Sequence, residues 1–67
     1  MKLTVNGEII DDVKAGTISE LLGELKVAPG RVAVEVNMAV IRKADHDTFR
    51  LHDGDVIEIV NFVGGGS

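Results

Sequence analysis

The chain has 67 residues, 45% of them hydrophobic, with seven Lys and Arg against eleven Asp and Glu, and it has no cysteine. This length suits one domain with a small core, and the absence of cysteine excludes disulfides and thiolate metal sites. The net charge of −4, spread over interleaved acids and bases, excludes the clustered positive charge that binds nucleic acid or anionic membranes. No apolar run approaches the roughly 18 residues of a membrane span and no signal peptide is visible, so we expect a cytoplasmic protein.

The amino-terminal segment predicts a β-hairpin. Residues 2–5 alternate polar and apolar side chains, and a second β-type run covers residues 8–13. Asn6-Gly7 between them is a strong signal for a two-residue turn.

A helix is expected to begin at Thr17 and to run for about ten residues. Thr17 and Glu20 have the spacing of a capping box, and Pro29 ends the segment. Glu20 and Glu24 are expected to face water. Apolar residues recur at helical spacing and form a stripe that can lie across a sheet: Ile18, Leu21, Leu22 and Leu25.

Three further β segments are predicted after the helix. Residues 31–36 alternate valines with other residues, a short turn leads into residues 40–41, and residues 55–63 form the last strand. Between the last two, residues 42–52 are expected to be an irregular, exposed crossing segment with a short helical turn.

The predicted order of elements, β-β-α-β-β-β, indicates an α+β domain in which a single helix covers one face of a mixed sheet. This order resembles the β-grasp, or ubiquitin-like, fold. We expect the β-grasp domain to occupy residues 1–63 and a flexible, glycine-rich tail to occupy residues 64–67.

Few side chains are suited to catalysis. The two histidines, His46 and His52, are interpreted as solvated loop residues, because a metal site needs three or four convergent ligands. Asp53 and Asp55, on either side of Gly54, are interpreted as turn-forming residues and not as calcium ligands. No bound cofactor or metal is therefore expected.

The unusual feature is the run Gly64-Gly65-Gly66 before Ser67. Such a composition is also typical of a flexible linker. However, an extended backbone without side chains could pass through a narrow slot in another enzyme and present its own terminal carboxylate to ATP. The reactive group would then be the main chain itself, which requires no catalytic side chain.

The last strand predicts an exposed apolar surface beside this tail. Ile57 and Ile59 suit the core, which places Glu58, Val60 and Phe62 on the opposite face. These three residues are candidates for a partner interface. Two alternatives are that the parity is shifted by one residue, or that Phe62 folds over its own core.

Together these segments resemble the ThiS family, the sulfur carriers of thiamin biosynthesis. The resemblance covers essentially the whole chain, and the segments that carry it are Asn6-Gly7, residues 15–22, 32–37 and 53–55, and above all residues 56–66. It implies that a ThiF-type adenylyltransferase adenylates the carboxylate of Gly66 with MgATP. It also implies that a cysteine desulfurase supplies sulfur for a thiocarboxylate there, and that thiazole synthase, ThiG, accepts this sulfur.

By the same resemblance the chain is a carrier and not an enzyme, with Gly64 and Gly65 leading to the modified Gly66. Ser67 departs from the family pattern. If Ser67 is encoded, a peptidase must remove it before Gly66 can be activated; if it is not encoded, the natural chain ends at Gly66. In both cases we expect the 67-residue form not to be adenylated.

Two other functions stay open at this point. A related carrier for molybdopterin, cysteine or methionine synthesis would differ in the protein that accepts the sulfur. A β-grasp binding module would dock through its sheet alone, and it would keep its function after deletion of residues 65–67.

Overall fold

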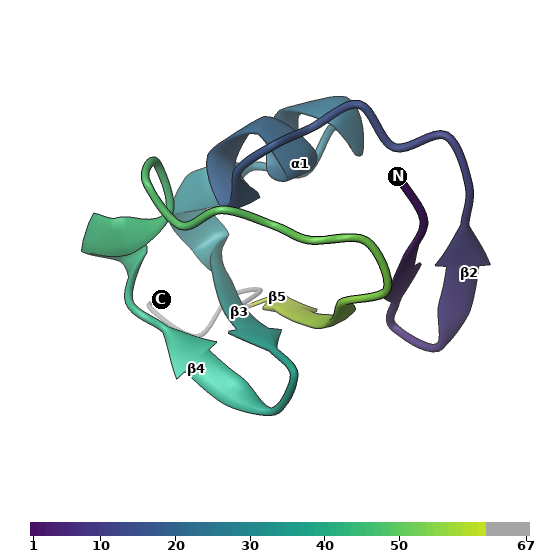
Figure 1. The fold of residues 1–67 in the computed structure, drawn as a ribbon. Coiled ribbons are helices and arrows are strands. Elements are labelled where there is room, and N and C mark those ends of the chain that lie inside the picture. Colours follow the sequence, from purple (N-terminus) through teal and green to yellow (C-terminus); the bar gives the residue numbers. More distant parts are fainter. Residues whose placement is uncertain (62–67) are drawn as a thin grey trace.

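A computed structural model describes residues 1–61, in which an α-helix packs on a mixed five-stranded sheet (Figure 1). The predicted order β-β-α-β-β-β is confirmed. The predicted tail at 64–67 and the end of the last strand at 62–63 lie outside the described residues. The elements are β1 (Leu3–Val5), β2 (Glu8–Ile10), α1 (Ile18–Glu24), β3 (Val32–Val36), β4 (Ala39–Ile41), β5 (Val56–Asn61) and two short 3-10 turns, η1 (Pro29–Arg31) and η2 (Lys43–Asp45).

Two hairpins form the outer parts of the sheet, and both turn through left-handed backbone. Asn6 and Gly7 join β1 to β2 with φ of 50° and 83°, as their sequence predicts. Asn37 and Met38 join β3 to β4 with φ of 51° and 75°, although methionine is an unusual residue for such a turn. The strand β2 ends at Ile10, whereas the predicted run extended to residue 13.

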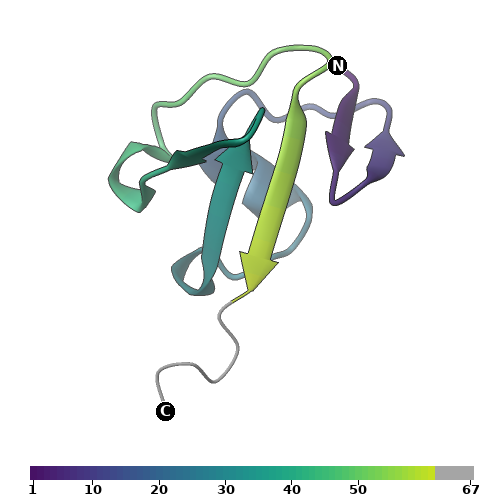
Figure 2. The same ribbon diagram turned by 90° about the horizontal axis from the view of Figure 1, so that it is seen from below.

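The chain places its last strand in the middle of the sheet. The strand order is β2-β1-β5-β3-β4, so that β5 lies between the two hairpins (Figure 2). Its contact with β1 is parallel and short, pairing Thr4 with Val56 and Val5 with Ile57. Its contact with β3 is antiparallel and runs over the whole of β3. The two hairpins are therefore joined into one sheet only through β5.

The helix begins as predicted but ends sooner. The Thr17 hydroxyl accepts a hydrogen bond from the Glu20 N–H at 3.2 Å, which is the expected N-cap. The helix then has seven residues in place of about ten, and its cap is Leu25. Glu20 and Glu24 are exposed, as expected, but they also have a structural role. Their carboxylates accept from the N–H groups of Gly16 at 2.7 Å and Ala15 at 2.9 Å, because the segment leading into the helix has no strand partner for these groups.

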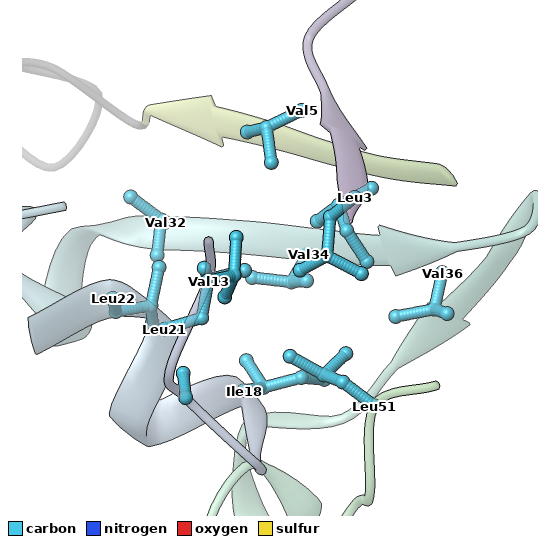
Figure 3. Packing of buried hydrophobic residues seen from close by; sticks show 12 residues of the cluster. Leu3, Val5, Val13, Ile18, Leu21, Leu22, Val32, Val34, Val36 and Leu51 are labelled. Atoms are coloured by element: carbon cyan, nitrogen blue, oxygen red, sulfur yellow. The ribbon is translucent and has the colours of Figure 1, made fainter. Parts of the chain in front are cut away.

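The core fills the space between α1 and the sheet (Figure 3). Side chains alternate along β3, where Val32, Val34 and Val36 are buried and the residues between them are half-buried. The helix contributes three of its four predicted apolar positions to this core, while Leu25 is half-buried at its edge. The twelve buried apolar residues are Leu3, Val5, Val13, Ala15, Ile18, Leu21, Leu22, Val32, Val34, Val36, Leu51 and Ile57.

The crossing segment between β4 and β5 is partly buried, which corrects one prediction. His46 is only 4% exposed, and its Nε2 lies 3.1 Å from the carbonyl oxygen of Ile41. The carbonyl oxygen of His46 accepts from the Ser19 N–H in the first turn of α1 at 3.0 Å. His46 is thus a structural residue that ties this segment to the helix, whereas His52 is exposed as expected.

Candidate functional site

The strand β5 leads from the centre of the sheet toward the glycines. Ile57 is buried and Ile59 is half-buried, whereas Glu58 and Val60 are exposed on the opposite side, so the predicted parity is confirmed. Phe62 and the predicted reactive glycines lie outside the described residues. The structure therefore brings together two of the three residues proposed as a partner interface, Glu58 and Val60.

The sheet face that carries Glu58 and Val60 is not covered by the helix (Figure 2). We call it the open face, and the strand registers place eight residues on it: Thr4, Ile9, Ala33, Glu35, Val40, Val56, Glu58 and Val60. Four of them are large apolar residues with much of their surface in solvent, namely Val40 (68% exposed), Ile9 (64%), Val60 (55%) and Val56 (44%). Exposed apolar residues gathered on one face are typical of a surface that binds another protein.

Sequence parity indicated only part of this face. Val56, Glu58 and Val60 could be assigned from the alternation along β5 alone, but Val40 and Glu35 join them because of the register between strands. Glu35 lies directly opposite Glu58, with Val40 as its neighbour on the other side. The pattern along each strand carries no information about which residues of the next strand it meets.

Two asparagines hold β5 in place where its neighbouring strands end. The side-chain oxygen of Asn6 accepts from the Ile59 N–H at 2.8 Å, and that of Asn37 accepts from the Val56 N–H at 2.9 Å. Each asparagine thus accepts from a backbone N–H of β5 that lies beyond the end of the neighbouring strand. β5 continues beyond its pairing with β1 as far as Asn61, where it is still paired with β3.

The aspartates near β5 have the structural roles that were predicted. Asp53 accepts from the Lys2 N–H at 2.7 Å, and Asp55 accepts from the His52 N–H at 2.8 Å, so both stabilise the turn before β5. Among residues 1–61, no group of three or more His, Asp or Glu side chains could hold a metal ion. Nor does that part of the chain contain a helix long and apolar enough to cross a membrane.

A family model, a relative and a solved structure all indicate the same family. The model of the ThiS family matches residues 2–66. The sulfur carrier protein ThiS of Bacillus subtilis is 43% identical over 65 residues, which are 96% of this chain and 98% of that protein. The crystal structure of a thiamine biosynthesis protein (ThiS) from Geobacter metallireducens matches with a TM-score of 0.81 and 40% identity, over 98% of this chain and 100% of that one. The predicted β-grasp fold is thereby confirmed.

Longer proteins contain a similar segment. A thiazole synthase of Paramagnetospirillum magneticum is 45% identical over 67 residues, which are all of this chain and 21% of that protein. A thiazole synthase of Magnetococcus marinus is 41% identical over 66 residues, or 20% of its length. The chain thus spans about one fifth of these two relatives.

Proposed function

We propose, since the chain belongs to the ThiS family, that it carries sulfur for thiamin biosynthesis as a thiocarboxylate on Gly66. The observation that carries this proposal is the extent of the family match, which runs through Gly65 and Gly66 and leaves out Ser67. The Bacillus sulfur carrier is similar over nearly its whole length, so the likeness is not confined to the fold.

The proposed chemistry takes place on the main chain. A ThiF-type adenylyltransferase binds MgATP and joins the Gly66 carboxylate to AMP, releasing pyrophosphate. The outer sulfur of a persulfide on a cysteine desulfurase then attacks the acyl-adenylate and displaces AMP. A second thiol cleaves the resulting S–S bond, which leaves the thiocarboxylate on Gly66 and a disulfide between the two thiols. MgATP belongs to the activating enzyme, and the carrier contributes the carboxylate that accepts the sulfur.

The residues of this chain serve to present the carboxylate and to dock its partners. Gly64 and Gly65 have no side chains that would obstruct a narrow active site. Glu58, Val60 and Phe62 are proposed to contact the partner beside the point where the tail enters it. On this proposal the chain is a substrate for other enzymes and is not itself a catalyst.

Thiazole synthase is the proposed sulfur acceptor. Two proteins with that name contain a segment that matches nearly all of this chain at 41–45% identity. The presence of such a segment within proteins named thiazole synthase favours thiazole synthesis over molybdopterin, cysteine or methionine synthesis. Joining a carrier and its acceptor in one chain would raise their effective concentration, which is useful only if the two act together.

The proposal is tested by intact-mass measurement. Two forms of the protein, one ending at Gly66 and one ending at Ser67, are incubated with a ThiF-type enzyme, MgATP, a cysteine desulfurase, cysteine and a thiol reductant. We expect the form ending at Gly66 to exchange one oxygen for sulfur and the longer form to stay unchanged. A form that lacks residues 65–67 is the control for sulfur bound elsewhere.

Two outcomes would contradict the proposal. If the form ending at Gly66 gains no sulfur under conditions that load a known ThiS, the chain is not a carrier. If it is loaded but thiazole synthase leaves the thiocarboxylate intact while a molybdopterin synthase subunit consumes it, the acceptor has been assigned wrongly.

A further inference from the structure

Two glutamates are direct cross-strand neighbours at the centre of the open face. Glu35 on β3 is the register partner of Glu58 on β5. Side chains directly opposite in a sheet have Cβ atoms about 5 Å apart, and like charges in that position destabilise the sheet. The ion pair found in residues 1–61 joins Arg42 to Asp45, so neither glutamate has a cationic partner there. In this part of the chain, two like charges are therefore cross-strand neighbours without an ion-pair partner.

Exposed apolar side chains surround this glutamate pair. Val40 lies beside Glu35 on the outer strand β4, and Val56 and Val60 precede and follow Glu58 on the same face of β5. All three valines are exposed. If a partner covered them, water would be excluded from the centre, and a charge interaction formed there would be strengthened.

The charge of this surface restricts what can cover it. A second copy of the chain would bring two such glutamate pairs together in a protein with a net charge of −4, which is unfavourable. No residue on the strands of the open face is basic. A complementary surface must therefore supply the positive charge, and a guanidinium, with five N–H donors in a planar fork, can bind two carboxylates at once.

We infer that the open face docks on an apolar patch of thiazole synthase, and that an arginine of this patch binds between Glu35 and Glu58. The identity of the partner rests on the proposed function. Gly66 follows Glu58 by eight residues, which span at most about 29 Å when fully extended. The arginine is thus expected within that distance of the site at which thiazole synthase accepts sulfur.

The inference is tested by titrating the protein into thiazole synthase from the same organism and measuring binding by calorimetry. The variants are Glu35→Gln, Glu58→Gln and the double variant, which keep the shape of the side chain and remove its charge. Glu8→Gln is the matched control, because Glu8 is an exposed carboxylate on β2 outside the open face. We expect the double variant to bind about tenfold more weakly or worse, and the control to bind as the wild type does. Added salt should weaken the wild type more than the double variant.

A second measurement separates binding from folding. Removing two repelling charges should raise the urea midpoint of the double variant, whereas a stabilising role of the glutamates would lower it. Weaker binding together with higher stability is the expected signature. Unchanged binding of the double variant, a lower urea midpoint, or a wild-type dimer through this face in light scattering would each overturn the inference.

Sulfur loading on Gly66, measured separately by mass, decides the proposed function. If loading and transfer are normal and the double variant binds normally, the docking inference fails and the carrier function stands. If binding depends on the glutamates but Gly66 is never loaded, the docking surface stands and the carrier function fails. If the wild type does not bind thiazole synthase, the docking inference is wrong whatever the loading shows.

Discussion

The two faces of the sheet have opposite characters, although the same strands form both. The face under α1 is closed and apolar, with Leu3, Val34 and Ile57 at 0% exposure. The open face has valines and an isoleucine in solvent around two glutamates. Alternation along the strands produces both faces, so neighbouring residues of the central strands point alternately to the core and to the open face. In a domain this small, folding and partner binding can therefore be assigned to different residues of the same strand.

The largest expected difference between the faces concerns two isoleucines. Ile57→Ala removes a fully buried side chain from β5 and is expected to destabilise the domain by about 2–5 kcal/mol, since it leaves a cavity. Ile9→Ala makes the same chemical change on the open face and should stay within about 0.5 kcal/mol of the wild type. Urea denaturation of both variants checks this. Equal losses would show that the open face contributes to folding as the core does.

The two histidines provide the next contrast. His46→Ala should cost about 1–3 kcal/mol, because it removes a buried ring and the partner of the Ile41 carbonyl. His52→Ala, at an exposed position, should change the free energy of unfolding by less than about 0.5 kcal/mol. Thermal denaturation is sufficient to compare them. A larger effect at His52 would contradict the structural role given to His46.

Substitutions at Asn6 test whether its side-chain hydrogen bond holds β5 in place. Asn6→Ala loses the acceptor for the Ile59 N–H and places alanine at a φ of 50°, so we expect a loss of about 1–2 kcal/mol. Asn6→Asp keeps an acceptor oxygen and tolerates this backbone, and it should lose less. Hydrogen exchange of the Ile59 amide should quicken in the alanine variant. If it does not, the side-chain bond does not protect β5.

The smallest effect is expected on the solvent side of the helix. Gly23→Ala should stabilise the domain by about 0.5–1 kcal/mol, since Gly23 is within α1 and an added Cβ meets nothing within 4 Å. Gly7→Ala has equal space but a φ of 83°, so it should destabilise. Chemical denaturation of both variants would show the difference in sign. A destabilising Gly23→Ala would contradict a helix whose outer side is free.

Local sequence was sufficient for the elements and for which side of each strand faces the core. Asn6 and Gly7 favour the first turn because both residues tolerate a positive φ. Thr17 starts the helix through one short-range hydrogen bond, in which its hydroxyl accepts from the Glu20 N–H. The parity of Ile57 and Glu58 follows from the period of two residues in a strand. These features depend on residues a few positions apart, so a single sequence contains them. The run of glycines at residues 64–66 is likewise read directly from the sequence.

Only the tertiary structure decided how these elements meet. It placed β5 between the two hairpins, set Glu35 opposite Glu58, and buried His46, which lies in a segment that was predicted to be exposed. Each of these depends on contacts between residues far apart in the chain, which alternation and helical spacing do not encode. The sequence by itself therefore determined the elements, their inward faces and the terminal glycines. The composition of the open face, and with it the glutamate pair, came from the register between strands, because register is set by packing across the whole core.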